Sequence, residues 1–409
     1  MKKLKTTVVG MYIRRGLSRE EASKNAVLPY VLKSGCKKHP DILSLTRQLD
    51  MLYGAKLSTG VIKNGDNQVI FFDCETISDK YAPDSPKLTK GLVSLLSSVV
   101  FEPLCENGAF INNIVEREKK TVTDRINALI NDKRSWAQLR CVQEVCGDDA
   151  FAISKFGEID EVEKINAKSL YEHYKKIITS SQIDIFTSGE ADLEELSAQI
   201  REAVKNLEFT DYSDFKTKKI ASVDNVKNIT EKMEVTQGKL AIGFTSEINA
   251  QDKDYPALAV LNSIYGAGTH SKLFNNVREK LSLAYYASSS LNKYKGIITV
   301  NAGIEFKNFK KAYDESISQL DEIKKGNISD DEFNFSIKSM INALNGYYDD
   351  QRYMQLYSLD CLYLGIDPDI EDYKKRLMSV TKEDCVRVAQ KVKENTVYFL
   401  TGNSNTEQN

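Results

Sequence analysis

The chain has 409 residues, more than a single hydrophobic core usually accommodates, so about two domains are expected. Its 56 basic and 58 acidic residues nearly balance and form no long basic block, which argues against nucleic acid or an anionic membrane as the main partner. No apolar run approaches the roughly 18 residues of a membrane span. Seven scattered cysteines, in a chain whose start does not read as a signal peptide, are expected to be reduced thiols. We therefore expect a cytoplasmic protein.

The first half predicts a regular series of strands and helices. A Thr- and Val-rich strand is expected over 5–15, and Ser18 is expected to cap a helix that ends at Gly35. Periodicity then predicts a helix, two strands joined by a polar turn at 64–67, four more helices and a closing strand. These elements cover 43–52, 55–62, 68–73, 88–100, 112–132, 135–146, 167–178 and 182–186.

The second half repeats the first. Ile126-Asn-Ala-Leu129 recurs as Ile341-Asn-Ala-Leu344, an offset of 341 − 126 = 215, and Ile165 and Val380 have the same offset. Two homologous α+β domains, over 1–211 and 233–409, are therefore predicted, joined by a polar linker at 212–232. The repeat argues against the alternative of one large α/β domain.

A helix over 256–265 runs into a glycine turn, and this stretch is the most informative of the chain. Gly266 and Gly268 permit unusual backbone angles or close approaches. Ser271 is expected to cap a second helix, and a strand over 283–287 follows, with Tyr285 facing away from its two neighbours. One buried stripe of that second helix is expected to consist of Leu273, Phe274, Val277 and Leu281.

This stretch resembles the C-terminal half of the insulinase/pitrilysin family of zinc metallopeptidases, which carry an inverted H-x-x-E-H motif. In active members the Arg and Tyr of the pattern bind and orient the peptide, so the resemblance implies substrate-binding roles for Arg278 and Tyr285. The alternative from the residues alone is that Arg278 is a surface residue paired with an acid and Tyr285 a half-buried strand residue. The matching positions are Ser271, Leu273, Phe274, Arg278, Glu279, Leu283, Ala284 and Tyr285.

The resemblance also implies a fold. Short members of the family, such as the subunits of the mitochondrial processing peptidase, consist of two α+β domains. Each domain is a mostly antiparallel sheet covered on one face by helices, and the resemblance extends over essentially the whole chain.

The zinc motif itself is degenerate. Counting back from the turn that starts at Gly35, the positions of the two histidines and the catalytic glutamate hold Ala26, Pro29 and Tyr30. The later helix places Arg125 at the third-ligand position (Asp124 if the alignment slips by one), and a guanidinium cannot bind zinc because it is always protonated. Zinc hydrolysis needs neutral imidazoles and a carboxylate base, so we expect no metal and no catalytic residue in this chain.

Other sites do not offer a replacement chemistry. The histidines His39, His173 and His270 are far apart in the sequence and cannot form a local metal site. The stretch 266–272 only faintly resembles a phosphate-binding loop, since it has no glycine before its lysine and no Ser or Thr after it. Acidic clusters such as 330–332 read as solvated helix ends.

Short members of the family often work in pairs, with zinc in one subunit and the Arg/Tyr pattern contributed by the other. We therefore predict a non-catalytic, substrate-binding subunit of a heterodimeric zinc endopeptidase that processes peptides or unfolded segments. The expected partner is a similar chain with an intact H-x-x-E-H, which holds the zinc; a homodimer in isolation is a further possibility. The alternative is an inactive structural or scaffolding homologue with no peptidase role. An active peptidase on its own conflicts with Ala26, Pro29 and Tyr30.

Overall fold

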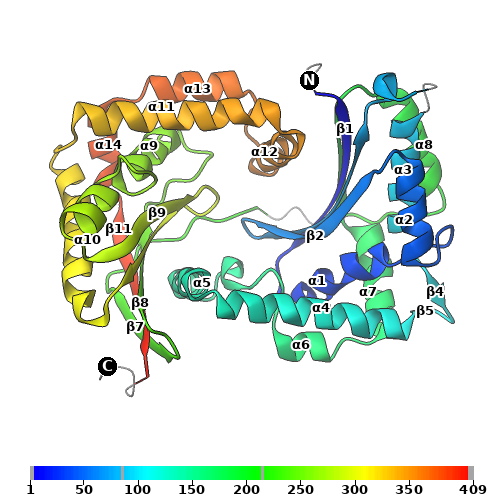
Figure 1. Ribbon diagram of the computed structural model, residues 1–409, viewed down its shortest axis with the longest axis horizontal. Helices are drawn as coiled ribbons and strands as arrows, with labels where there is room; N and C mark the ends of the chain where they lie inside the picture. Colours follow the sequence, from blue (N-terminus) through cyan, green and yellow to red (C-terminus); the bar gives the residue numbers. More distant parts are fainter. Residues whose placement is uncertain (1–3, 84–86, 213–215, 404–409) are drawn as a thin grey trace. The chain divides into compact units, whose positions relative to one another are not determined.

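The computed structural model describes residues 4–83, 87–212 and 216–403. The chain forms two compact units, each with one main sheet and several helices (Figure 1). The expected α+β class is thereby confirmed. Unit 1 comprises the chain up to Asn127, Ile153–Lys216 and Tyr347–Leu359. Unit 2 comprises Ala128–Ala152, Thr217–Gly346 and the chain from Asp360 onward.

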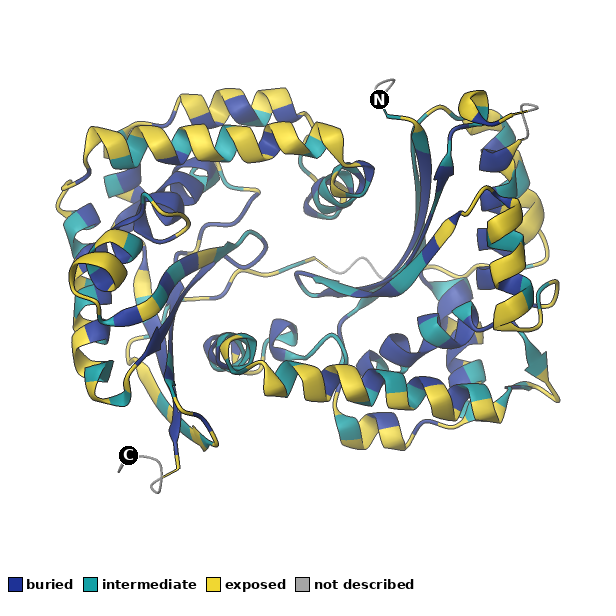
Figure 2. Ribbon diagram, viewed as in Figure 1, coloured by how far each residue is buried: buried dark blue, intermediate teal, exposed yellow. Residues whose placement is uncertain are grey.

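Unit 1 is built on a four-stranded antiparallel sheet in the order β2-β3-β1-β6. The two central strands are rich in β-branched and aromatic residues and are mostly buried (Figure 2). The turn from β2 to β3 places Gly65 at φ 58°, which glycine adopts without strain. The strands are β1 (Thr6–Gly16), β2 (Lys56–Asn64), β3 (Asn67–Ile77) and β6 (Gln182–Ser188).

Two helices, α1 and α3, pack directly on this sheet. α1 begins after Ser18, whose hydroxyl accepts a hydrogen bond from the backbone N–H of Glu21 at 3.3 Å, so the predicted cap is confirmed. The helices of unit 1 are α1 (Arg19–Lys33), α2 (Ile42–Met51), α3 (Leu88–Phe101), most of α4 (Asn112–Asn131), α6 (Ile159–Glu163), α7 (Ala167–Ser180) and α8 (Leu193–Val204). A short ladder pairs β4 (Cys105–Glu106) with β5 (Ala109–Phe110).

Unit 2 is built on a five-stranded sheet in the order β7-β11-β8-β10-β9. All of its pairs are antiparallel except β7 with β11, and every residue of β10 is buried. Its strands are β7 (Lys227–Met233), β8 (Gly238–Thr245), β9 (Ala284–Asn292), β10 (Ile297–Ile304) and β11 (Lys393–Gly402). Its helices include α9 (Tyr255–Tyr265), α10 (Phe309–Lys324), α11 (Asp330–Gly346), α13 (Ile370–Met378) and α14 (Lys382–Ala389).

The two sheets share one strand order, which supports the sequence repeat. The spatial order β2-β3-β1-β6 of unit 1 corresponds to β9-β10-β8-β11 of unit 2. In both series the strands that lie side by side are the second, third, first and fourth along the chain. Unit 2 adds β7 as an extra edge strand, formed, except for Met233, by residues that the sequence assigned to the linker at 212–232. Residues 213–215 of that linker lie outside the described residues, as do 1–3 and 404–409 at the ends of the two predicted domains.

Each unit also contains a helical segment from the other half of the sequence. α5 (Lys133–Cys146) belongs to unit 2, and the first part of α12 (Gln351–Leu364) belongs to unit 1. The predicted domains, 1–211 and 233–409, are each one continuous stretch of sequence. The two compact units differ from them, because each unit consists of three separate stretches of the chain.

The start of α12 is bound to unit 1 by polar contacts. The side-chain amide of Gln355 donates to the carbonyl of Val8 at 3.0 Å, and its oxygen accepts from the Tyr12 hydroxyl at 3.2 Å. The same hydroxyl lies 2.8 Å from a carboxylate oxygen of Asp73 on β3. Burial raises the pKa of Asp73 despite this hydrogen bond. These buried groups fix α12 to the sheet because leaving any of them unpaired would cost free energy.

α5 packs on unit 2 through apolar side chains that reach β8 at a glycine. A Cβ placed on Gly243 would lie 2.3 Å from a methyl carbon of Val145 and 3.3 Å from the sulfur of Cys141. Both α5 residues belong to a buried cluster with Ala241 and Tyr398 of the sheet. The absence of a side chain at Gly243 therefore allows the helix to come this close.

Two further expectations concern cysteines and membranes. All seven cysteines are free thiols, as predicted, and six of them are buried. None of the helices formed by residues 4–83, 87–212 and 216–403 combines the length and the apolar character that crossing a bilayer requires.

The close approach at Gly243 gives a stability prediction. We expect Gly243→Ala to lower the free energy of unfolding by about 1–3 kcal/mol, because the new methyl group overlaps Val145. In a Val145→Ala background the same change should cost less, since the opposing methyl groups are gone. Urea unfolding of the single and double variants measures the difference.

Gly346→Ala serves as the control, because nothing lies within 4 Å of a Cβ at Gly346 in α11. This variant should be neutral or slightly more stable. Equal effects of Gly243→Ala in the two backgrounds would contradict the packing argument.

Candidate functional site

The glycine turn and the helix after it organise the predicted Arg/Tyr site in unit 2. The amide of Ser289 on β9 donates to the carbonyl of Gly266 at 2.9 Å, and a Cβ at Gly266 would lie 2.5 Å from that nitrogen. The predicted close approach is thus present. Leu273–Lys280 then forms a π-helix, and the hydroxyl of Ser271 accepts from the Phe274 amide at 3.4 Å near its start.

The predicted apolar stripe of this helix is only partly correct. Leu273 and Val277 are fully buried, and Phe274 is half-buried. Leu281 is 44% exposed, contrary to the prediction. The helix ends at Lys280 and Ser282 adopts φ 49°, so the chain turns away before Leu281 can continue the buried surface.

Arg278 lies on the exposed side of the π-helix. Its guanidinium carbon is 4.7 Å from the centre of the Phe274 ring, and its Nε lies 3.4 Å from a carboxylate oxygen of Glu279. The side chain of Arg278 is still 42% exposed. Among the described residues, no hydrogen bond or ring contact joins Arg278 to Tyr285. Arg278 is therefore oriented by its own helix and open to solvent.

Tyr285 protrudes because the strand pairing is irregular where it lies. Ile304 of β10 pairs with Ala284, whereas the preceding Gly303 pairs with Tyr286, so Tyr285 is the extra residue of a β-bulge. Tyr285 as a whole is 62% exposed, although large aromatic residues usually pack. Tyr285 is not the half-buried strand residue of the alternative interpretation.

Other tyrosines of this region serve packing. The Tyr286 ring lies against Gly303, and the guanidinium of Arg134 from α5 lies 4.1 Å from its centre. Burial raises the pKa of Tyr286 to about 12. Tyr265 is fully buried and donates to the carbonyl of Ser316 at 2.9 Å. Tyr285 thus differs from its aromatic neighbours in being both large and free of such packing.

In unit 1 the structure brings two of the degenerate motif positions together. The guanidinium carbon of Arg125 on α4 lies 4.9 Å from the centre of the Tyr30 ring on α1. Ala26 is fully buried one turn earlier, and Pro29 is also buried within α1. Positions that the resemblance assigns to metal ligands are therefore adjacent, as the fold requires, but they carry a phenol, a cation and an alkyl group.

These residues do not fit a zinc ion. Zinc sites in proteins use imidazole, thiolate or carboxylate ligands, and Arg125 offers only protonated donors. Among the residues the structure describes, no group of three or more His, Cys, Asp or Glu side chains could hold a metal.

Further charged side chains interact with Tyr30 or with Arg125, and they come from α1, α4 and the segment after Ile153. Glu118 is buried and accepts from the Ser34 hydroxyl at 3.2 Å and from Nε of Arg117 at 2.7 Å. Burial lowers the pKa of Lys33, although the Glu118 carboxylate raises it. Burial likewise lowers the pKa of Lys155, with a smaller effect in the same direction from Arg125.

The histidines have structural roles instead. His173 is buried, and its Nε2 lies 2.7 Å from the Asn25 side-chain oxygen. Asn25 in turn donates to Gln68 at 2.8 Å, and Gln68 donates to the carbonyl of Lys155 at 2.7 Å. Nε2 of His270 lies near two serine hydroxyls. Sequence reasoning missed this network because its members are spread over about 150 residues.

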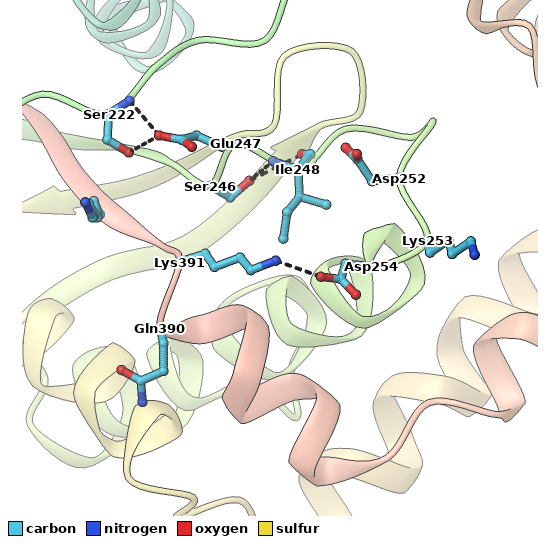
Figure 3. A pocket seen from close by; sticks show the side chains of 10 residues that line it. Ser222, Ser246, Glu247, Ile248, Asp252, Lys253, Asp254, Gln390 and Lys391 are labelled. Carbon is cyan, nitrogen blue, oxygen red and sulfur yellow. Dashed lines mark hydrogen bonds and ion pairs between the residues drawn. The ribbon is translucent and has the colours of Figure 1, made fainter.

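A separate pocket of about 580 Å³ lies in unit 2 between the end of α14 and the loop before α9 (Figure 3). Its acidic side chains are paired: Asp254 accepts from Arg387 at 2.8 Å and Lys391 at 2.9 Å, and Glu247 accepts from the Ser222 hydroxyl at 2.9 Å. Asp252 pairs with Lys219 at 2.8 Å. These contacts tie loops together, so we assign the pocket a structural role.

Comparison with known proteins decides the family. The family model "Peptidase M16 inactive domain" matches residues 164–340. "Probable inactive metalloprotease YmfF" from Bacillus subtilis is 36% identical over 407 residues, covering 98% of this chain and 94% of that protein. The chain belongs to the M16 peptidase family.

Solved structures agree on the fold of this M16 chain. A conserved protein from Enterococcus faecalis V583 superposes with a TM-score of 0.91 at 27% identity, covering 100% of this chain and 96% of the other. A protease from Helicobacter pylori gives a TM-score of 0.80 at 15% identity, covering 98% and 95%. The recognition from the Arg/Tyr pattern and the degenerate zinc motif is thereby confirmed.

Restoring the M16 zinc motif should require four changes. Ala26→His, Pro29→Glu and Tyr30→His recreate H-x-x-E-H, but we expect this variant to retain no stoichiometric zinc, because Arg125 keeps a cation beside position 30. Adding Arg125→Glu removes that charge and supplies a carboxylate, so zinc retention should rise towards one ion per chain. Elemental analysis after dialysis measures it.

Both variants should also unfold more readily, by about 1–3 kcal/mol, because an imidazole at the fully buried position 26 overpacks α1. A further variant carries Arg125→Gln instead of Arg125→Glu. It removes the positive charge that repels zinc but adds no carboxylate ligand, so it separates the two effects. Equal zinc retention by the three- and four-residue variants would contradict the placement of Arg125.

The buried His173 gives a pH dependence. Burial lowers its pKa to about 4 in the folded state, below the value of about 6.5 in an unfolded chain. Between these values the unfolded state binds the proton more readily, so the free energy of unfolding falls as pH falls. We expect a loss of about 3 kcal/mol from pH 7 to pH 4 that His173→Gln largely removes, measured by denaturant unfolding. His39→Gln, on the turn after α1, is the matched control.

Proposed function

We propose that this M16 chain is the non-catalytic, substrate-binding subunit of a heterodimeric zinc endopeptidase that processes peptides or unfolded segments in the cytoplasm. The observation that carries the proposal is the exposure of Tyr285 on its β-bulge, in the same turn region as the exposed Arg278. Bulges re-aim side chains and are frequent next to functional sites. An exposed tyrosine that no packing requires is a candidate for contact with another molecule.

The two side chains have suitable chemistry for holding a peptide backbone. Arg278 can donate several fixed hydrogen bonds to peptide carbonyls or to a carboxylate. The Tyr285 hydroxyl can donate to a carbonyl or accept from an amide. In this proposal they position the peptide, while the partner, a similar chain with an intact H-x-x-E-H, supplies zinc and the catalytic base. Positioning alone can contribute substantially to rate.

The alternative is an inactive structural homologue. It is favoured by the contacts of Arg278 with Phe274 and Glu279, which hold the guanidinium against its own helix. The description of the Bacillus subtilis relative as a probable inactive metalloprotease is compatible with both proposals.

The test is made on the reconstituted pair. Affinity purification of this chain from its own cells should recover a companion of similar size that carries H-x-x-E-H. With that companion, Arg278→Ala combined with Tyr285→Phe should lower kcat/KM for a peptide by roughly tenfold or more, because hydrogen bonds to the peptide are lost. Initial rates of peptide cleavage measure it.

Arg201→Ala combined with Tyr212→Phe is the matched control, since it removes the same groups from exposed positions outside the site. It should cleave at the wild-type rate. Unchanged cleavage by the Arg278/Tyr285 variant, or purification of this chain with copies of itself alone, would favour the structural alternative.

A further inference from the structure

The outer strand of the unit 1 sheet, β6, presents an edge that no strand among the described residues covers. β6 pairs with β1 alone. Its counterpart in unit 2, β11, pairs with β8 on one side and with the additional strand β7 on the other. β7 runs parallel to β11 over 396–402. Since the two sheets otherwise share one strand order, unit 1 has an open position where unit 2 has a strand.

The backbone along this edge is able to form further hydrogen bonds. Every second residue of an edge strand directs its N–H and C=O groups away from the sheet. Within 4–83, 87–212 and 216–403, no backbone hydrogen bond reaches residues 185–188 from outside the ladder with β1. All seven residues of β6 are half-buried, so the strand lies at the surface and not beneath another element. A further strand can therefore pair with it.

The other edge strands of the two sheets are protected against such pairing. β2 carries Lys56 and Lys63, and β7 contains three charged residues, which discourage the addition of another chain. β9 is closed at Ser289, whose amide donates to the carbonyl of Gly266. β6 pairs with β1 in an unbroken register, contains no lysine or proline, and has Asp184 as its single charged residue. A regular edge with so little charge is the kind that adds a strand from another chain.

The side chains of β6 indicate what the added strand should contain. Ile183 and Ile185 lie on one face of the sheet, and Phe186 lies on the other. The Phe186 ring contacts Tyr12 edge-on, with 5.8 Å between the ring centres. β-branched and aromatic side chains on adjacent strands stabilise one another through contacts across the strands. An uncharged segment rich in Val, Ile or Thr therefore suits this edge.

We propose that the open edge of β6 binds an extended, uncharged peptide segment as an added strand, parallel to β6 as β7 is parallel to β11. Backbone hydrogen bonds supply the affinity, and alternate side chains supply the preference for β-branched residues. The choice of a peptide rests on the proposed peptide-binding function, to which it adds a second contact and a class of segment. A second copy of this chain suits the edge less well, because β6 strands related by a two-fold axis run antiparallel.

The experiment is a fluorescence-anisotropy titration of the purified full chain with three labelled, amidated peptides. The first alternates Thr and Val over eight residues between two terminal lysines, the second is N-methylated at every Val, and the third is N-methylated at every Thr. We expect one of the two methylated peptides to bind about tenfold more weakly than the other, because only every second N–H of an added strand faces β6. Equal affinities of all three peptides would overturn the proposal.

Hydrogen–deuterium exchange locates the bound peptide. The amides of residues 182–188 should exchange more slowly when the unmethylated peptide is present, since those that face away from β1 gain a partner, whereas the amides of β7 should be unaffected. Peptide binding that leaves exchange within 182–188 unchanged would overturn the β6 site.

A charge placed on the edge should prevent the pairing. Thr187→Lys, at a half-buried position of β6, should weaken binding of the unmethylated peptide by about tenfold. Thr230→Lys is the matched control, because it makes the same change on the edge strand β7. It should bind like wild type, and equal losses in the two variants would contradict the assignment to β6. Circular dichroism and thermal unfolding confirm that each variant remains folded.

The failure of this inference is distinguishable from the failure of the proposed function. Binding that Arg278→Ala combined with Tyr285→Phe weakens, and that Thr187→Lys does not, would overturn the β6 site and leave the proposed function standing. Binding of no peptide would overturn both. A dimer that forms without peptide and that Thr187→Lys dissociates, measured by analytical ultracentrifugation, would assign the edge to a second copy and overturn the assignment to a peptide.

Discussion

The contact between α5 and β8 at Gly243 is the constraint on which unit 2 depends. Cys141 and Val145 reach the sheet there only because no side chain intervenes, and they complete a core that includes strands at the far end of the sequence. The segment after α5 is held as well, by an ion pair of 2.7 Å between the fully buried Lys295 and the partly exposed Asp149. Since the buried charge of Lys295 is costly without its partner, the pair stabilises the observed position of the segment.

Unit 1 receives its exchanged helix by different chemistry. Where α5 contributes alkyl groups and thiols, α12 contributes Gln355, which satisfies the carbonyl of Val8 and the hydroxyl of Tyr12. Each sheet therefore completes its packing with a helix from the other half of the chain. A cut between the halves would leave an apolar surface over β8 and unpaired polar groups over β1, both of which are unfavourable in water or when buried.

Local sequence patterns predicted the elements well, because helix caps and apolar periodicity are local signals. Ser18 caps α1 as expected, and the two sheets share one strand order, which agrees with the two homologous domains that the repeat predicted. Long-range pairing could not be predicted in this way. β7 has only half-buried or exposed residues and becomes a strand by pairing with β11, and the bulge that exposes Tyr285 exists only through the register with β10. The adjacency of Tyr30 and Arg125 was expected from the resemblance, not from periodicity.

The lost metal site shows why a degenerate motif is more than a set of missing ligands. Ala26 is packed so tightly that a larger side chain needs new space, and Pro29 removes a backbone N–H from the interior of α1. Arg125 adds a charge that repels a cation. Packing, backbone and electrostatics therefore each oppose a zinc ion at these positions, and the ring of Tyr30 supports the guanidinium that lies where a ligand would be needed.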